Sequence, residues 1–169
     1  MSDIFKDIKI RNHFKPGDIG YLIHLHGKLY HEGFGFGIGF EIYVAESFTQ
    51  FYRQYLPEKD KIWICEHGQE IIGFVLMMDR GERVGQLRFF LIHPDYRHIG
   101  LGNELMNRCL AFAHQKEFQQ VILWTTDQLP AARHLYQKHG FLMVEEKPSD
   151  SFGVTLKEQK YELILSPKP

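Results

Sequence analysis

A glycine-rich segment offers the clearest chemistry in this sequence. Arg97, Gly100 and Gly102 form the pattern R-x-x-G-x-G between a long apolar run and an amphipathic stretch. Glycines let a backbone approach a ligand closely and adopt positive φ, and the first turn of a helix leaves N–H groups unpaired. The segment therefore suits an anion such as a pyrophosphate. A tight strand–helix turn without a ligand fits this motif alone equally well.

Other nucleotide-binding motifs fit the chain poorly. The sequence has no G-x-x-x-x-G-K-[S/T] pattern, so no P-loop is expected. Residues 33–39, here called the Gly/aromatic run, read GFGFGIG and follow a helical pattern, whereas a dinucleotide motif follows a strand. Two interpretations of this run stay open. Phe34 and Phe36 either belong to a mobile flap over an acceptor or fill the core beside an irregular turn.

Composition narrows the possible ligands and partners. Lys and Arg total 20 against 21 Asp and Glu, and a nucleic-acid binder would carry a basic surplus. No apolar run approaches the ~20 residues of a membrane span. The ten histidines include His24 and His26, but residues two apart on a helix point to different faces. We therefore expect no nucleic acid, no membrane and no metal.

The composition and length of the sequence also predict the cellular compartment and the number of domains. The first ten residues lack the apolar segment of a secretory signal, and the two cysteines, Cys65 and Cys109, are too few for a disulfide framework. A reduced, cytoplasmic protein is the simplest interpretation. A length of 169 residues predicts a single domain over residues 1–169.

The elements that must position the glycine-rich segment alternate along the chain. Apolar spacing predicts helices over 19–29, 40–55, 102–113 and 130–139, and strands over 8–14, 61–66, 71–78, 84–92, 121–125, 141–146 and 159–165. Short polar turns predict antiparallel hairpins, while the helix between the strands at 84–92 and 121–125 predicts a parallel crossover. The expected fold class is mixed α/β, a mostly antiparallel sheet with helices on both faces.

Two blocks of this sequence resemble a known family. Residues 89–102, FFLIHPDYRHIGLG, resemble the acetyl-CoA signature of the GNAT N-acetyltransferases. Ala132, Leu135, Tyr136, Gly140 and Phe141 resemble the family's second pattern, A-x-x-L-Y-x-x-x-G-F. Both blocks occur in the family's order, and the resemblance covers nearly the whole chain. It implies a GNAT-like sheet whose fourth and fifth strands splay apart.

A finer resemblance involves three further segments. Residues 26–30 (HGKLY), 123–136 (LWTTDQLPAARHLY) and 144–153 (VEEKPSDSFG) are similar to the acetyltransferase half of proteins fused to MarR-type winged-helix regulators. No winged-helix half is present in this sequence, so the resemblance implies no DNA-binding role.

The family resemblance implies where acetyl-CoA binds. The strand before the loop would hydrogen-bond the pantetheine arm through its backbone, and the loop with the following helix start would hold the pyrophosphate. The strand residues are Phe90, Leu91 and Ile92, and the loop residues are Arg97, His98, Ile99, Gly100, Leu101, Gly102 and Asn103.

The resemblance also implies a catalytic acid. The sequence departs from the family pattern at two positions. Tyr136 matches a tyrosine near the acetyl-CoA sulfur and would protonate the leaving thiolate; otherwise it is a packed aromatic residue. Leu129 stands where members often carry Asn, a contact that Thr126 could replace. Gln86 stands where some members carry a basic Glu, and an amide cannot accept the proton of the amine.

The general base must then lie elsewhere or be a water chain. Glu32 and Glu41 flank the Gly/aromatic run in the segment that builds the acceptor site in this family, and we prefer them in that order. His26 and His31 are weaker candidates. Each of the four could instead be a solvated or capping side chain.

The expected function is direct transfer of an acetyl group from acetyl-CoA to a primary amine. An α-amine with a pKa of ~8 is about 10% neutral at pH 7, whereas a lysine amine is almost wholly charged. A small-molecule or amino-acid acceptor is therefore favoured. The alternative is a CoA-binding sensor or interaction module with little turnover. The resemblance adds a possible homodimer through the C-terminal strands.

Overall fold

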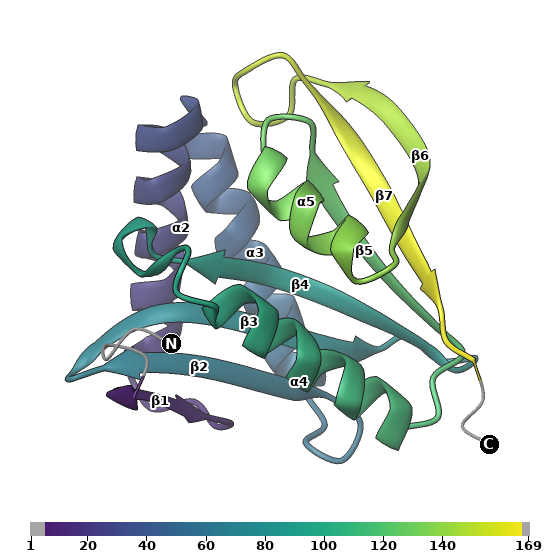
Figure 1. Ribbon diagram of the computed structural model, residues 1–169. Helices are drawn as coiled ribbons and strands as arrows, with labels where there is room; N and C mark the ends of the chain where they lie inside the picture. The colour runs from purple at the N-terminus through teal and green to yellow at the C-terminus, as the bar shows by residue number, and fades with distance from the viewer. Residues whose placement is uncertain (1–5, 167–169) are drawn as a thin grey trace.

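The computed structural model describes residues 6–166, and its elements follow the expected order (Figure 1). The strands and helices, with one short 3-10 turn η1, have these bounds: β1 Ile8–Arg11, α2 Asp18–Phe34, α3 Ile38–Gln54, β2 Lys61–His67, β3 Glu70–Asp79, β4 Val84–Ile92, η1 Pro94–Tyr96, α4 Leu101–Gln115, β5 Gln120–Thr126, α5 Pro130–Lys138, β6 Leu142–Ser149 and β7 Leu156–Ile164. Among residues 6–166, none of the helices combines the length and the apolar content that a membrane crossing requires.

The strands form one seven-stranded sheet in the order β1-β2-β3-β4-β5-β7-β6. All neighbouring pairs are antiparallel except β4 and β5, which α4 connects as a parallel crossover. The turns between β2 and β3 and between β3 and β4 place Gly68 and Gly81 at positive φ, which a glycine adopts without strain. The expected mixed, mostly antiparallel sheet is confirmed.

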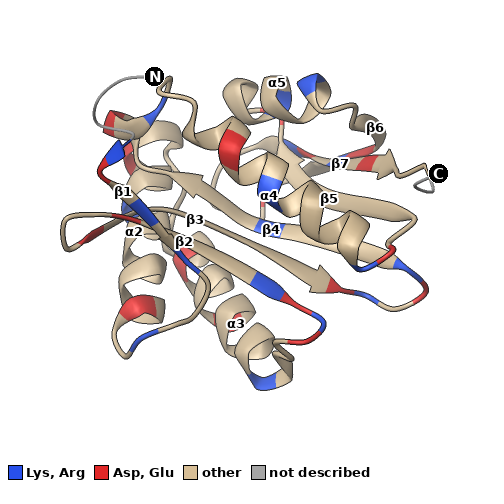
Figure 2. Cartoon of the chain, turned by 60° about the horizontal axis from the view of Figure 1, so that its bottom comes forward, with Lys and Arg blue, Asp and Glu red and all other residues tan. Residues whose placement is uncertain are grey.

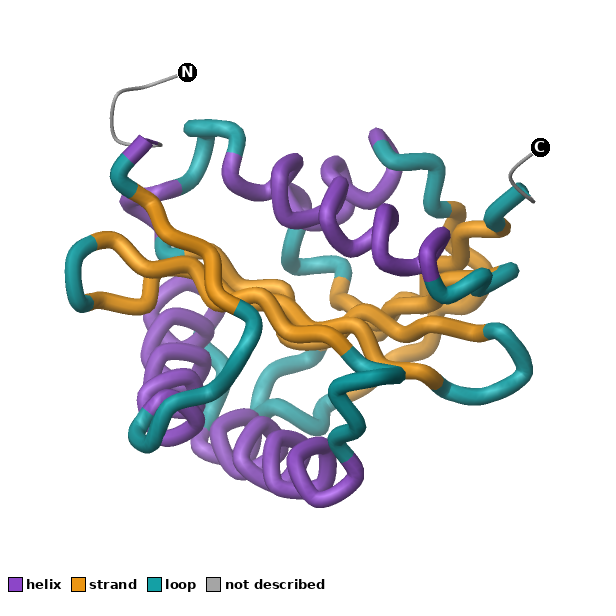
Figure 3. The backbone as a smooth tube through the Cα atoms, turned by 90° about the horizontal axis from the view of Figure 1, so that it is seen from below, coloured by secondary structure: helices purple, strands orange, loops and turns teal. Residues whose placement is uncertain are grey.

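Helices cover both faces of the sheet and create two apolar cores (Figure 3). One core packs α2 and α3 against the sheet, and the other packs α4 and α5 against the opposite face. Almost all of β3 is buried because both of its faces are covered. Charged residues lie at turns, on the helices and along β7 (Figure 2). Cys65 and Cys109 are free and fully buried in the second core, as expected.

The parallel pair β4–β5 separates partway along its length. Its ladder joins Val84 with Gln120 and ends at Leu87 and Leu123, although both strands continue. A bulge in β4, where the register against β3 shifts, follows at Phe89, whose φ is +56°. The expected splay of the fourth and fifth strands is therefore confirmed, and it opens the sheet between two helix layers.

Some expected boundaries are wrong. The first strand ends at Arg11, and α2 extends through Phe34 into the Gly/aromatic run. The chain then leaves the helix at Gly35, whose φ is +72°. The strands expected over 141–146 and 159–165 form a longer hairpin, β6 and β7. Charged cross-strand pairs such as Lys157 with Glu146, at 2.9 Å, stabilise the added part, which shows little apolar alternation.

His26 is buried in the first core with one ring nitrogen unpartnered. Its Nδ1 lies 2.7 Å from the Leu22 carbonyl oxygen and must donate to it, so the neutral ring carries its free lone pair on Nε2. Nε2 has no hydrogen-bond partner among the described residues. Burial lowers the pKa of His26 to about 4. The rings of Tyr30, Phe48 and Phe89 surround it.

This burial predicts a pH-dependent stability. The unfolded chain protonates His26 below pH ~6.5, whereas the folded chain keeps it neutral down to about pH 4. Stability is therefore complete above pH ~6.5 and falls as the pH drops, by about 3 kcal/mol at pH 4. Urea unfolding at several pH values should show this loss, and His26→Phe should remove most of it. In His26→Phe, the lowered pKa of His139 would leave a smaller dependence of stability on pH. His24→Gln, at an exposed position of α2, should keep the wild-type slope, and equal slopes in wild type and His26→Phe would contradict the assignment.

Candidate active site

A cavity of about 320 Å³ occupies the place where β4 and β5 separate. The walls come from α2, α3, β4, β5, α5, β7 and the loop between β6 and β7. The lining residues are His26, Tyr30, Phe36, Phe40, Tyr43, Val44, Gln86, Leu87, Arg88, Phe89, Phe90, Trp124, Thr125, Thr126, Leu129, Ala132, Tyr136, Phe152 and Glu158. The cavity therefore joins the two blocks of sequence that carried the resemblance.

The open part of β4 leads into the glycine-rich loop. Beyond Leu87, the edge of β4 that faces β5 has no ladder partner, so backbone groups that point to this edge are not paired with β5. Leu91 is buried, while Phe90 and Ile92 are half-buried. Arg97 Nε donates to the Ile92 carbonyl oxygen at 3.2 Å, which fixes the start of the loop against the end of the strand.

The start of α4 presents unpaired N–H groups. Gly100 precedes the helix with a φ of +97°, and no side chain caps it. The first intrahelical bond runs from Glu104 N to Gly100 O at 3.1 Å, so the N–H groups of residues 101–103 lack intrahelical partners. His98 also has positive φ, +62°, and is exposed together with Arg97 and Gly100. This geometry can bind an anion such as a phosphate.

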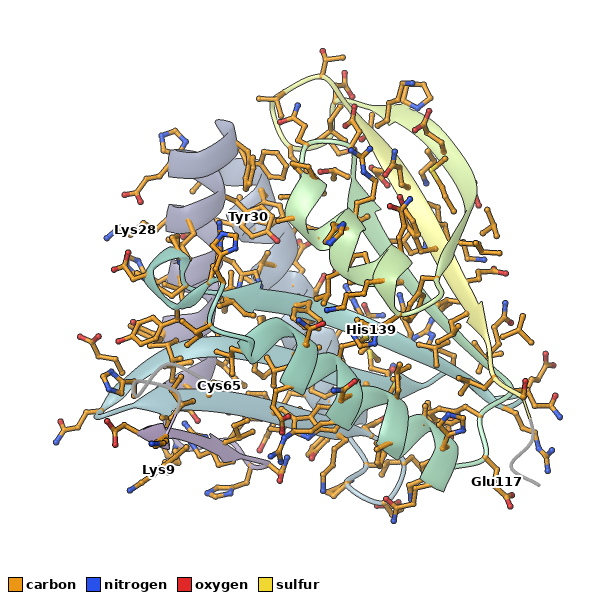
Figure 4. All side chains as sticks on the ribbon, in the orientation of Figure 1. Lys9, Lys28, Tyr30, Cys65, Glu117 and His139 are labelled. Atoms are coloured by element: carbon orange, nitrogen blue, oxygen red, sulfur yellow. The ribbon has the colours of Figure 1, made fainter. Side chains whose placement is uncertain are left out.

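Two neighbouring positions show why the helix start has this shape. A Cβ on Gly102 would lie 3.4 Å from Ile92 Cδ1 and 3.5 Å from Leu135 Cδ2, ordinary contact distances, so α4 packs directly against β4 and α5 at this point. The Asn103 carboxamide is already engaged, because its Oδ1 lies 3.2 Å from His139 Nε2 on α5. His139 thus lies between α4 and α5 (Figure 4). Leu101 is buried, and Ile99 packs against the second core.

Tyr136 forms part of the opposite wall. It is 5% exposed on α5, and its ring contacts the Phe90 ring edge-to-face at 6.4 Å between centroids. Burial raises the pKa of Tyr136, so its phenol stays protonated at physiological pH. Tyr30 extends from α2 toward α5 (Figure 4), and burial raises its pKa to about 12. Both residues line the cavity, and their protonated hydroxyl groups can donate hydrogen bonds.

The candidate bases lie in different places. Glu32 is exposed on α2, and Glu41 is half-buried on α3 beside Gly27 of α2. Neither lines the cavity. Six residues separate Glu32 from His26, which at 3.6 residues per turn places them on different sides of the helix. Of the four candidates, only His26 lines the cavity, and His31 is exposed with Nδ1 2.9 Å from the Phe36 carbonyl oxygen.

The aromatic side chains of the Gly/aromatic run belong to the cavity wall. Phe36 is 2% exposed and packs on Phe40 at 5.0 Å and on Phe152 at 5.4 Å between ring centroids. Gly37 N donates to the Phe152 carbonyl oxygen at 2.8 Å. These contacts support the core interpretation of the run over a mobile flap.

Sequence reasoning missed several cavity residues. Arg88 and Glu158 are the charged side chains of the lining, and neither had been considered. Arg88 interrupts the apolar end of β4, a signal that could have identified it. Glu158 gave no such signal, because it lies among other charged residues of β7 and only the pairing of β7 with β5 brings it to the cavity.

The comparisons with known proteins agree with this geometry. Residues 28–141 match the model of the acetyltransferase (GNAT) family. An uncharacterised N-acetyltransferase of Methanocaldococcus jannaschii is 25% identical over 153 residues, which cover 86% of this chain and 64% of that protein. An amino-acid acetyltransferase of Buchnera aphidicola is 28% identical over 130 residues, 76% of this chain but 26% of that protein. The chain thus spans less than two thirds of these curated relatives.

The fold is shared with solved structures. Spermidine N-acetyltransferase from Vibrio cholerae, solved with CoA and spermine, has a TM-score of 0.70 at 18% identity over 96% of this chain and 98% of its own. The finer resemblance to the acetyltransferase half of MarR-type fusion proteins gains no support from the matches. Since the family model covers more than half of the sequence, including the splayed strands and the loop, the chain belongs to the acetyltransferase (GNAT) family, whose members are acyl-CoA-dependent N-acetyltransferases.

Proposed function

We propose that this protein transfers the acetyl group of acetyl-CoA to the primary amine of a small molecule or an amino acid. The cavity at the end of the β4–β5 ladder carries the proposal, because it contains Tyr136 and the start of the open part of β4, the strand that leads into the anion-binding loop. The amine nitrogen attacks the thioester carbonyl carbon, a C–N bond forms and the C–S bond breaks. The amine loses a proton and the thiolate gains one. This reaction needs no metal.

The residues of the proposed site have the following roles in this reaction. Backbone groups at Phe90, Leu91 and Ile92 would bind the pantetheine arm and polarise the thioester carbonyl. The segment from Arg97 through Asn103 would hold the pyrophosphate, mainly through main-chain N–H groups. Tyr136 would protonate the thiolate. Glu32 and Glu41 remain predictions for the general base, although an α-amine with a pKa of ~8 has a neutral fraction that can react without one.

The main alternative is a CoA-binding sensor with little turnover. Leu129 and Gln86 line the cavity where many family members carry Asn and Glu, which favours this alternative. Thr126 favours the enzyme, because it is 6% exposed, lines the cavity, and its Oγ1 has no hydrogen-bond partner among the described residues. Buried hydroxyl groups rarely stay unpaired, so this oxygen is available to bind the cofactor arm in place of the asparagine.

A single substitution at Tyr136 separates the two functions. We expect Tyr136→Phe to lower acceptor-dependent release of free thiol from acetyl-CoA by at least about tenfold, because the leaving thiolate loses its proton donor. CoA affinity, measured by calorimetry, should hardly change. Tyr52→Phe, at an exposed position on α3, is the matched control. Tight CoA binding without acceptor-dependent release across a broad amine panel would favour the sensor.

The loop assignment has its own test. Gly100→Glu should abolish CoA binding in calorimetry, because it places a carboxylate against the pyrophosphate. No heavy atom lies within 4 Å of a Cβ built on Gly100, so steric conflict with the protein does not explain such a loss. Gly100→Ala measures the separate effect of backbone strain at a φ of +97°. Unchanged affinity in Gly100→Glu would remove the assignment of this site.

We further propose that residues 1–169 form a single acetyltransferase domain that acts in the cytoplasm as a homodimer. Four apolar side chains of the terminal hairpin support the dimer: Leu142 is 71% exposed, Met143 48%, Val144 53% and Ile164 71%. Sedimentation velocity should show a dimer in wild type and a monomer in Val144→Lys, since a charge in the interface must be desolvated. A monomeric wild type at micromolar concentration would contradict this arrangement.

A further inference from the structure

We propose that the acceptor amine carries a carboxylate beside an apolar or aromatic body, and that Arg88 binds this carboxylate. The inference rests on the proposed acetyl transfer and specifies the chemical class of its second substrate. It depends on the charges and ring surfaces of one side of the cavity, here called the acceptor end, which is lined by Arg88, Tyr43, Trp124 and Phe152.

Arg88 is a cavity cation without a counter-ion among residues 6–166. Within residues 6–166, no Asp or Glu forms an ion pair with Arg88, whereas Arg11 and Arg108 pair with Asp18 and Glu104 at 2.8 and 2.7 Å. The guanidinium group is permanently charged, and its fork of N–H donors matches a carboxylate. A guanidinium that lines the cavity without a paired carboxylate among the described residues therefore indicates that the anion comes with the ligand.

Two aromatic contacts hold Arg88 in place. Its guanidinium carbon lies 4.8 Å from the centre of the Phe89 ring, and its NH2 group donates to the Tyr43 hydroxyl at 3.3 Å. Phe89 in turn stacks on Phe48 at 4.2 Å between ring centroids. These contacts leave other N–H groups of the guanidinium available, and they fix its position before a ligand arrives.

The carboxylate that lines the cavity, that of Glu158, already has a cationic partner. Glu158 lies 3.7 Å from Lys147 Nζ, and the same Lys147 ammonium lies 4.8 Å from the Trp124 ring centre. Arg88 therefore contributes one uncompensated positive charge. A single carboxylate matches that charge, whereas a polyamine would add further positive charge beside Arg88 and find no free carboxylate in the lining.

The rest of the acceptor end is aromatic. Tyr43 is 44% exposed and Trp124 is 38% exposed, and Phe152 lies 5.4 Å from the Tyr43 ring. Such ring surfaces bind apolar or aromatic groups through area burial and stacking. The body of the acceptor next to its carboxylate is therefore apolar or aromatic.

The position of Arg88 also suits the reaction. Phe90, whose backbone borders the proposed thioester site, follows two residues later on the same strand, and two residues span at most about 7 Å of chain. An α-amine is separated from its carboxylate by one carbon atom. A carboxylate bound at Arg88 thus leaves the amine free to reach the carbonyl carbon, where the C–N bond forms as the C–S bond breaks.

Matched pairs of acceptors test the proposal. Acetyl transfer would be measured by mass and by thiol release for phenylalanine against phenethylamine, tyrosine against tyramine, tryptophan against tryptamine and leucine against isoamylamine. Spermidine would represent polyamines. Wild type should favour at least one amino acid over its decarboxylated partner by about tenfold or more in kcat/KM, as a charge-assisted bidentate contact predicts.

Variants connect this preference to one side chain. Arg88→Gln should remove the preference mainly through a higher KM for the amino acid, with little change for the decarboxylated amine. Arg88→Lys should restore part of it, because it keeps the charge and loses the fork. Arg53→Gln, at an exposed position of α3, is the matched control. Thermal unfolding would verify that each variant is folded.

The outcomes distinguish this inference from the proposed function. Acetyl transfer that is equal for both members of every pair, or fastest for spermidine, overturns the carboxylate site and leaves the acetyltransferase intact. A preference that survives Arg88→Gln overturns the role of Arg88. If no amine is acetylated, binding decides: N-acetylphenylalanine should bind the CoA-loaded protein about tenfold more weakly in Arg88→Gln. Equal binding of N-acetylphenylalanine in wild type and Arg88→Gln would also reject the proposal. Weaker binding in Arg88→Gln would support the carboxylate site even if no turnover is observed.

Discussion

The early end of the β4–β5 ladder is the constraint on which the rest of the site depends. Beyond Leu87 and Leu123 the two strands no longer bond to each other, so their facing edges carry free N–H and C=O groups inside the fold. Leaving such groups unpaired and buried costs free energy, which makes the opening a place for a polar chain from a ligand. The bulge at Phe89 and the helix layers on both faces keep the gap from closing.

Phe89 shows how the surrounding structure supports this opening. A φ of +56° is unusual for a bulky residue and costs of order 1–3 kcal/mol. Phe48 stacks on its ring and the Arg88 guanidinium lies against it, at 4.2 and 4.8 Å. One distorted residue therefore connects the α3 helix, the open strand and the charge at the acceptor end.

The cavity combines a mostly neutral interior with charge at its margins. Burial keeps His26 unprotonated and keeps Tyr30 and Tyr136 protonated, so none of the three carries charge near neutral pH. Neutral walls of low polarity strengthen the field of Arg88, the cation of the cavity lining. This arrangement suits a reaction in which a neutral amine attacks and negative charge develops on oxygen and then on sulfur.

The sequence by itself determined the fold class, the order of the elements and the glycine-rich loop before α4. These features follow from local patterns: apolar periodicity, the R-x-x-G-x-G spacing before a helix, and Pro130 at the start of the helix that carries Tyr136. The sequence also left the Gly/aromatic run undecided. Only its contacts with Phe152, more than one hundred residues away in the chain, place its rings in the cavity wall.

The tertiary structure decided which charged side chains line the cavity. Glu32 and Glu41 were attractive because they flank a glycine-rich segment, but helix rotation and packing keep both out of the cavity. Arg88 and Glu158 reach it because strand alternation and the β5–β7 pairing direct them there. Local pattern determines which elements form, whereas the side chains that meet in a cavity depend on contacts between distant segments, and no local spacing records those contacts.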